Sequence, residues 1–179
     1  MSAPAPHRLR TADLPHNRPA PFALAPDAAA QAAIAQSLDL IELRKLRFDG
    51  QITAQGQQDF ALTGQLGATV VQTCVVTLAP VTTRLDVPVH RLYVADFQEP
   101  EGDEVEMPED DGTEALGPWI DLEAVMIEAL SLALPAYPRS ADAQLAQTQF
   151  AAPGVAPMTD EAARPFAGLA GLRDKLKDT

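Results

Sequence analysis

The segment FALTGQLGATVVQTCVVTL, which spans residues 60–78, decides the fold. Its apolar side chains fall on one parity: Phe60, Leu62, Leu66, Ala68 and Val70, then Cys74, Val76 and Leu78 after the polar Gln72. A period of two is typical of a β-strand with one buried face. Similar runs extend from residue 43 to residue 97, so the sequence predicts an antiparallel sheet. Both an open sheet and a partly closed barrel fit this pattern.

Two dipeptides mark turns in this β-rich region. Asp49-Gly50 is a common hairpin signal, and Ala79-Pro80 precedes a further alternating run over residues 81–90. Pro88 lies inside that run and indicates an edge strand or a bulge, because proline cannot donate to a β-ladder.

Two helices are expected beside the sheet. Asp27 is suited to cap a short Ala-rich helix that follows it, which must pack on the core because it is too short to be stable alone. Asp121 is suited to cap the most apolar helix, which Pro135 and Pro138 end. The apolar residues of this second helix are Ile120, Val125, Met126, Ile127, Leu130 and Leu134. We expect it to cover the open face of the sheet, which makes the fold class α+β.

The chain is long enough for one domain with flanking segments. Residues 1–26 are Pro-rich and are expected to be a flexible or extended arm. Residues 27–138 form the predicted α+β core, with an acidic loop near 99–117. Residues 139–163 are predicted to be a linker, and residues 164–179 a short amphipathic helix.

The formal net charge of −12 comes from a single stretch of the chain. Residues 99–128 hold twelve acids and no base, and the thirteen acids elsewhere equal the thirteen bases in number. The part from 99 to 114 is predicted to be a solvated loop, because a block of like charges repels itself. It holds nine candidate partner-binding acids: Glu99, Glu101, Asp103, Glu104, Glu106, Glu109, Asp110, Asp111 and Glu114.

Three interpretations of these nine acids stay open. In the first, they only increase solubility. In the second, they dock on a basic partner such as a ribosomal protein, or mimic nucleic acid. In the third, they bind a divalent cation. The spacing of the carboxylates is not that of an EF-hand, which disfavours the third interpretation.

A protein this acidic is not expected to bind nucleic acid non-specifically, because such binding needs a basic surface. The C-terminal segment is nevertheless locally basic, and its candidate RNA contacts are Arg164, Arg173, Lys175 and Lys177. The simpler interpretation is that these bases solvate an amphipathic helix and complement its dipole. Together with Arg44, Lys45 and Arg47, they define an alternative function, a direct RNA-binding module.

No catalytic, metal or cofactor site is predicted. Cys74 is the single cysteine and is expected to pack as a small hydrophobe within a strand, since no neighbour in sequence lowers its pKa. His90 is expected to be exposed, and His7 and His16 fall in the Pro-rich arm. Trp119 is expected to anchor the start of the apolar helix. Without a catalytic site, no enzyme activity is expected. No apolar run reaches the ~20 residues that span a bilayer, so a soluble cytoplasmic protein is expected.

The order of these features resembles the YceD family, the large ribosomal RNA subunit accumulation proteins. The residues that carry the resemblance, over about 40–177, are VVQTCVVTLAPV at 70–81, Val94-Ala95-Asp96, the acidic loop, Asp121-Leu122, Leu134-Pro135, Tyr137-Pro138, Pro165-Phe166, Leu169 and Leu172. The resemblance implies a non-enzymatic factor for accumulation of 23S rRNA, which binds a large-subunit ribosomal protein or a precursor particle. RNA contact would be secondary.

The resemblance also bears on metal binding. Many members of the family carry Cys-x-x-Cys where this chain has Cys74-Val75-Val76-Thr77, and further cysteines where it has Arg139-Ser140-Ala141. Thr77 stands in place of the second cysteine. The resemblance therefore implies that the same fold closes here without a metal.

Overall fold

The computed structural model describes residues 7–97, 112–144 and 151–158. The chain divides into two compact units, Met1–Ala141 and Asp142–Thr179. The helices and strands of the first unit are β1 (Arg8–Arg10), a 3₁₀ turn (Thr11–Asp13), β2 (Ala20–Leu24), α1 (Ala28–Ser37), β3 (Glu42–Gln55), β4 (Asp59–Thr73), β5 (Pro80–Val94), β6 (Thr113–Ala115), β7 (Trp119–Asp121) and α2 (Leu122–Ala133). In the second unit, the described residues contain a turn in which the Val155 N–H donates to the carbonyl of Ala152 at 3.0 Å.

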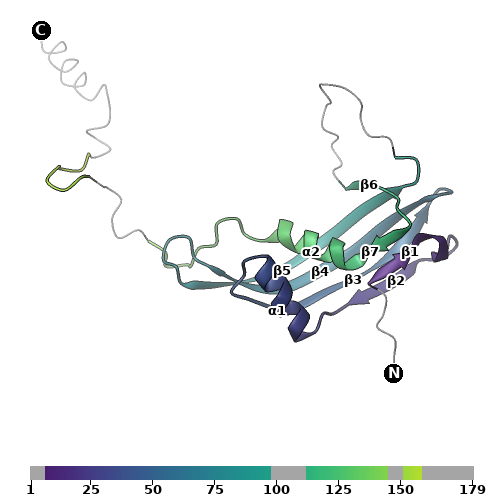
Figure 1. Cartoon of the computed structure of the whole chain (residues 1–179), viewed down its shortest axis with the longest axis horizontal. Helices are drawn as coiled ribbons and strands as arrows, with labels where there is room; N and C mark the ends of the chain where they lie inside the picture. The colour runs from purple at the N-terminus through teal and green to yellow at the C-terminus, as the bar shows by residue number, and fades with distance from the viewer. Residues whose placement is uncertain (1–6, 98–111, 145–150, 159–179) are drawn as a thin grey trace, which may run out of the picture. The chain divides into compact units, whose positions relative to one another are not determined.

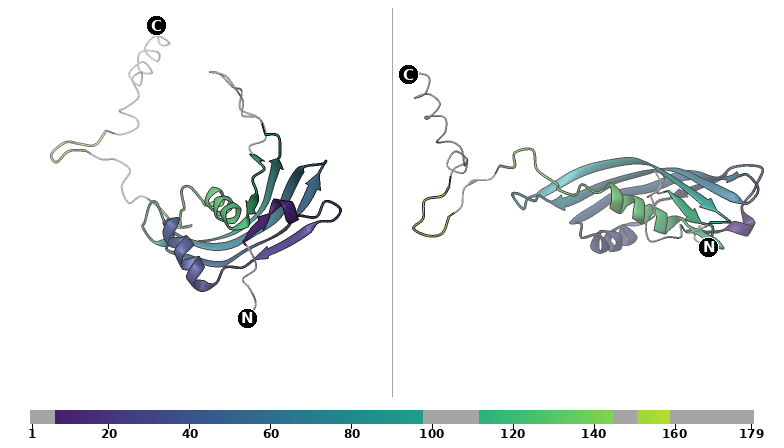
Figure 2. Two further views of the ribbon diagram at one scale, coloured as in Figure 1. Left: turned by 45° about the vertical axis from the view of Figure 1, so that its right-hand side comes forward. Right: turned by 90° about the horizontal axis from the view of Figure 1, so that it is seen from above.

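The main sheet has five strands in the order β2-β3-β4-β5-β6, and a separate two-stranded sheet joins β1 to β7. All pairs are antiparallel except β5–β6, which is parallel. The long strands curve around α2, which lies on their concave side (Figures 1 and 2). The fold class is therefore α+β as predicted, and the sheet of the described residues is open rather than closed into a barrel.

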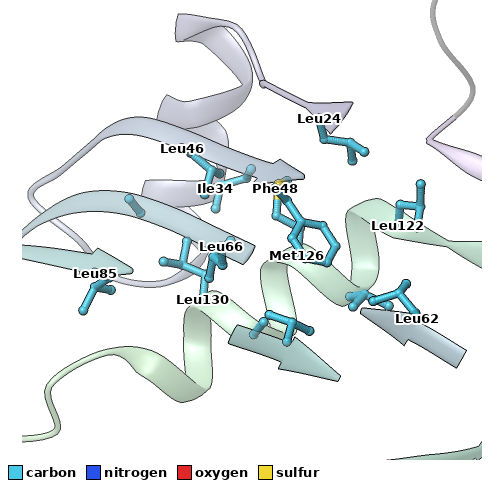
Figure 3. Packing of buried hydrophobic residues seen from close by; sticks show 14 of the residues in the cluster. Leu24, Ile34, Leu46, Phe48, Leu62, Leu66, Leu85, Leu122, Met126 and Leu130 are labelled. Atoms are coloured by element: carbon cyan, nitrogen blue, oxygen red, sulfur yellow. The ribbon is translucent and has the colours of Figure 1, made fainter. Parts of the chain in front are cut away.

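The α2 helix covers the concave face of the sheet, as its apolar pattern predicts. Leu122, Met126 and Leu130 repeat at a spacing of four residues, and each is at most 1% exposed. Figure 3 shows them facing Phe48, Leu62 and Leu66 from the sheet. The Asp121 carboxylate caps the helix by accepting from the Ala124 N–H at 3.1 Å, and the helix ends at Ala133, just before Pro135.

The first helix also begins where the sequence predicts. The carboxylate of Asp27 accepts from the Ala30 N–H at 2.8 Å, and α1 packs on β3 through the buried Ile34 and Ala35. The side chain of Gln31 fixes the contact, because its amide oxygen accepts from the Leu46 N–H at 3.3 Å.

The Asp49-Gly50 dipeptide is not a turn, contrary to prediction. β3 runs through it to Gln55, and the turn lies at Gly56, whose φ is 62°. Gly50 lies directly opposite Gly64, and a Cβ atom on Gly50 would come within 2.7 Å of the Phe22 ring and of the Gly64 Cα. The glycine allows close packing between strands, which a turn signal in sequence does not reveal.

β4 ends at Thr73, before the point that the alternation predicts. Cys74 follows the strand directly, and residues 75–77 form a turn before β5 begins at Pro80. The bulge lies in β3, where the register shifts between Arg44 and Arg47.

Pro88 lies on an edge, which is one of the two predicted alternatives. β6 pairs only with residues Leu92, Tyr93 and Val94 of β5. The Leu92 N–H points toward β6, since it donates to the Gly112 carbonyl at 2.9 Å. Pro88 has the same parity in β5, so its missing N–H lies on the side where no strand of the described residues pairs.

Residues 8–24 take part in the fold, within the segment expected to be a flexible or extended arm. β2 pairs with β3 over five residues, and Leu14 and Leu24 are buried in the core. The Pro-rich composition did not reveal this pairing, because β2 is a short edge strand that carries a proline itself.

Candidate functional site

Of the nine acids predicted to bind a partner, the structure describes Glu114, which lies on β6. Residues 99–111, with the other eight, lie outside the described residues, as do Arg164, Arg173, Lys175 and Lys177. β6 occupies part of the segment that was expected to be a loop near 99–117. Because β6 pairs with the end of β5, Glu114 is held at the edge of the sheet.

Arg91 joins three elements at this edge. It lies opposite Leu62, which is fully buried on the concave face, so Arg91 faces inward toward α2. Its Nε contacts the carboxylate of Glu114 at 3.2 Å, and its Nη2 contacts that of Glu128 on α2 at 2.8 Å. The Arg91 side chain is only 13% exposed, so this pairing fixes β6 and α2 to β5.

Tyr93 lies two residues further along the same face of β5. Its side chain is 5% exposed, and its hydroxyl has no hydrogen-bond partner among the residues that the structure describes. Burial raises the pKa of Tyr93, and the nearby carboxylates of Glu114, Glu128 and Asp121 raise it further, while Arg91 acts in the opposite direction. The phenol is therefore neutral near pH 7.

Trp119 does not anchor the apolar helix, contrary to prediction. Its side chain is 49% exposed on β7, whereas the next residue, Ile120, is 1% exposed and occupies the core. In a strand, neighbouring side chains point to opposite faces, so only one of the two residues can be buried.

The basic residues near the start of β3 are largely compensated by nearby acids. Arg44 pairs with Glu42 at 3.4 Å, and Arg47 lies 3.8 Å from Asp49. Lys45 occupies the bulge with a φ of 53°. These contacts reduce the positive field that an RNA phosphate would meet on β3.

The turn after β4 lies beside the segment that follows α2. The Cys74 Sγ accepts hydrogen bonds from the Thr77 N–H at 3.4 Å and from the Ser140 N–H at 3.5 Å. The Val75 N–H donates to the Pro138 carbonyl at 3.0 Å. Hydrogen bonds between groups of this chain therefore tie the turn to the segment that follows α2.

These contacts lower the pKa of Cys74 from 9.0 to about 6. The side-chain hydrogen bond from Thr77 is the largest cause, the main-chain donors of Ser140 and Thr77 add to it, and burial acts in the opposite direction. The expectation that no neighbour in sequence lowers this pKa is wrong, because Thr77 turns back to donate to the sulfur, and Ser140 reaches it in the fold. The predicted burial of the thiol is confirmed, although Cys74 lies after the strand rather than within it.

The described residues contain neither a metal-binding cluster nor a helix that could span a membrane. No group of three or more His, Cys, Asp or Glu side chains among residues 7–97, 112–144 and 151–158 is arranged to hold a metal ion. In the same part of the chain, no helix combines the length and the apolar character that crossing a membrane requires.

Sequence reasoning missed Arg91 and assigned no site role to Tyr93. The only signal was their parity, which places a charged residue and a tyrosine in line with the inward-facing Val89. Glu114 and Glu128, the partners of Arg91, lie 23 and 37 residues after it in the chain, so only the fold shows the cluster.

Residues 62–173 match the family described as "Large ribosomal RNA subunit accumulation protein YceD". No curated protein matches the chain. No solved structure matches it either. The matched segment spans most of β4, all of β5, the acidic region, β6, β7 and α2.

Proposed function

This chain belongs to the YceD family, and we propose that it acts by binding a basic ribosomal protein, or a large-subunit precursor particle that displays one, through its acidic segment. Family membership implies a role in accumulation of the large-subunit ribosomal RNA, and the family is not a known enzyme family. The proposal adds the binding mode, with the protein as a non-enzymatic assembly factor for 23S rRNA and its subunit.

One observation carries the proposal: all of the net charge resides in residues 99–128. A concentrated negative field attracts a basic partner over a distance and increases its rate of association. The same field repels RNA phosphates, which favours a protein partner over naked RNA.

The described part of this region supports the proposal. Glu114, Asp121 and Glu128 gather where β6, β7 and the start of α2 meet, and the chain runs into β6 directly from the acids of residues 99–111. By contrast, the outward side chains of Arg47 and Arg84 contact Asp86, at 3.9 and 2.6 Å. At the acidic edge, Arg91 pairs with Glu114 and Glu128 while Arg8 pairs with Asp121, so three carboxylates face two guanidinium groups and the described edge keeps a net negative charge.

A charge-matched pair of variants tests the proposal. The first variant replaces eight acids by their amides: Glu99, Glu101, Asp103, Glu104, Glu106, Glu109, Asp110 and Asp111. It leaves Glu114 intact, because that carboxylate holds Arg91. The control replaces eight acids elsewhere: Asp13, Asp39, Asp96, Asp142, Asp160, Glu161, Asp174 and Asp178. The control spares the helix cap Asp27, and each variant removes eight negative charges.

The measurement is co-sedimentation with large-subunit precursor particles in a sucrose gradient, at two salt concentrations. We expect the first variant to lose association and the control to keep most of it. Association of the wild type is expected to weaken with salt, as charge-driven binding does. Equal association of both variants would show that the acidic segment serves solubility alone.

The alternative function is direct RNA binding by the basic C-terminal segment. It predicts that purified protein shifts 23S fragments in a gel, with an affinity that falls as salt rises. Four phosphate contacts from Arg164, Arg173, Lys175 and Lys177 would give a slope of about −3 in log affinity against log salt. Loss of that shift on replacing the four bases by glutamine, with particle binding lost as well, would favour this alternative.

A further inference from the structure

A small hollow opens at the acidic edge of the sheet, between the end of β5, the strands β6 and β7, and the first turns of α2. Its volume is about 230 Å³. The side chains that matter for its chemistry are Tyr93, Glu114, Trp119, Asp121 and Glu128, and we call this set the Tyr93 niche. Binding pockets for drug-sized molecules usually have volumes of about 300–1,000 Å³, so the niche suits a single side chain rather than a whole small molecule.

The hydroxyl of Tyr93 is the unusual group in the niche. Tyr93 is 95% buried, and its hydroxyl is without a hydrogen-bond partner in the described residues. The hydroxyl itself is not fully buried, so it is the accessible polar tip of a side chain whose ring is buried, and it is available to bind an incoming group. The hydroxyl lines a hollow that is open to the outside, so an incoming group can reach it.

The other polar groups of the niche are acceptors. Arg91 uses one oxygen of Glu114 and one of Glu128, and the second oxygen of each carboxylate makes no hydrogen bond or ion pair with the described residues. Asp121 uses both oxygens, one to cap α2 and one to pair with Arg8 at 3.1 Å, so it contributes negative charge only. Three carboxylates and two guanidinium groups leave the surroundings of the niche with a net charge of −1.

These groups select a cation with several donors. A bare metal ion is disfavoured, because no three of the described acidic side chains are arranged to hold one. A guanidinium is planar and carries five N–H donors, so it can reach two carboxylate oxygens and a hydroxyl at once. The half-exposed indole of Trp119 offers a face on which a guanidinium can stack.

We propose that the Tyr93 niche receives the side chain of an arginine from the basic partner, with the Tyr93 hydroxyl and the free oxygens of Glu114 and Glu128 as acceptors. The assignment rests on the proposed function, since it presupposes a basic protein partner. It adds the place on this chain where one side chain of that partner is bound.

The test uses a small probe and the full chain. The probe is Nα-acetyl-arginine amide, and its matched control is the citrulline analogue, which has nearly the same shape without the charge. Trp119 is the only tryptophan of the chain, so its fluorescence reports on the niche directly. Backbone amide shifts of Ala115 and Ala124 in a nitrogen-15 spectrum give a second readout, since both residues line the hollow.

A matched pair of variants gives the decisive comparison. Tyr93→Phe removes only the niche hydroxyl. Tyr137→Phe removes the hydroxyl of the second tyrosine in the sequence, whose side chain is 81% exposed. We expect saturable binding of the arginine probe that Tyr93→Phe weakens about tenfold, the usual effect of one hydrogen bond to a charged group. Tyr137→Phe should leave the binding unchanged, and the citrulline probe should not bind.

Failure of this assignment is distinguishable from failure of the proposed function. Equal binding of the arginine probe by wild type and Tyr93→Phe, or no saturable binding, would overturn the niche whatever the particles do. Probe binding as expected, with unchanged co-sedimentation of Tyr93→Phe with precursor particles, would overturn the assignment to the partner's arginine. A third outcome is that the niche binds the probe while the eight-acid variant still associates with particles. That outcome would refute only the proposed role of residues 99–111 and would leave the niche standing.

Discussion

The two ends of the β4–β5 pair each bury one polar side chain, and they treat it in opposite ways. At one end, past the pair of Thr73 with Pro80, the Cys74 sulfur accepts from two main-chain N–H groups. At the other end, Tyr93 pairs with Phe60, and its hydroxyl finds no acceptor or donor among the described residues. At about 3.3 Å per residue, the two ends lie roughly 40 Å apart.

The difference separates a structural end of the sheet from a functional one. At the Cys74 end, Thr77 and Ser140 donate to the buried sulfur, although the buried Oε1 of the nearby Gln72 accepts no hydrogen bond from the described residues. At the Tyr93 end, carboxylates and a hydroxyl are left with unused acceptor positions beside the region that carries the net charge. Structures that complete their own hydrogen bonds gain stability, whereas sites that leave them open are suited to binding.

The largest effect on stability is expected from the core between α2 and the concave face of the sheet, which lies between the two ends. Leu130 on α2 is fully buried against the sheet, so Leu130→Ala should lower the free energy of unfolding by about 2–5 kcal/mol, measured by urea denaturation. Leu132→Ala, at a position that is 74% exposed on the same helix, should change it by less than about 0.5 kcal/mol. Equal effects of the two substitutions would mean that α2 does not cover the concave face as described.

A smaller loss is expected at the Cys74 end. Cys74→Ala removes the acceptor and leaves the partly buried N–H groups of Thr77 and Ser140 without their partner, so Tm should fall by roughly 3 °C. Cys74→Ser retains an acceptor and should lose less. If Cys74→Ala were as stable as wild type in calorimetry, the hydrogen bonds to the sulfur would not hold this end closed.

The same sulfur should make stability depend on pH. The folded pKa of Cys74 lies at about 6, below its ordinary value of 9.0, so the thiol is deprotonated in the fold at pH values where it is protonated in the unfolded chain. This contribution is therefore complete above pH 9 and is lost as pH falls toward 6. The stability gap between wild type and Cys74→Ala should widen from pH 6 to pH 9 in denaturation midpoints. A gap that narrows over that range would show that burial keeps the thiol protonated.

The smallest effect, with the opposite sign, is expected at the Tyr93 end. Tyr93→Phe removes a hydroxyl that makes no hydrogen bond with the described residues, while the buried ring stays in place, so the free energy of unfolding should stay the same or rise by up to about 1 kcal/mol. Chemical denaturation of Tyr93→Phe, with Tyr137→Phe measured in parallel as the control, checks this change in the free energy of unfolding. A loss of more than about 1 kcal/mol would mean that the hydroxyl is bonded in the folded chain, and the contrast between the two ends would disappear.

Much of the fold could be predicted because its signals are local. The alternation of Leu62, Leu66 and Val70 marks the concave face of β4, and the carboxylates of Asp27 and Asp121 cap the two helices as expected. The errors in predicting the fold arose where a residue that usually marks a local turn instead makes a contact with residues distant in sequence. Gly50 allows close packing against Gly64 and Phe22, although Asp49-Gly50 has the sequence of a turn.

The candidate site was predicted only in part. The charge of residues 99–128 is visible in sequence, because it needs no knowledge of the fold. The niche is not visible, because Tyr93, Glu114 and Glu128 come from three elements that meet only when β6 pairs with β5 and α2 folds over the sheet. The contact of Ser140 with Cys74 is equally non-local, as it joins residues 66 positions apart.

The most direct test of the central claim is the ratio of 23S to 16S rRNA in cells depleted of this protein and supplied with one version of its gene. The account predicts that the wild type and the eight-acid control restore the ratio, while the variant neutralised at residues 99–111 leaves 23S rRNA selectively low at equal protein levels. Full restoration by that variant would contradict the account, because the protein would then support the large subunit without its acidic segment.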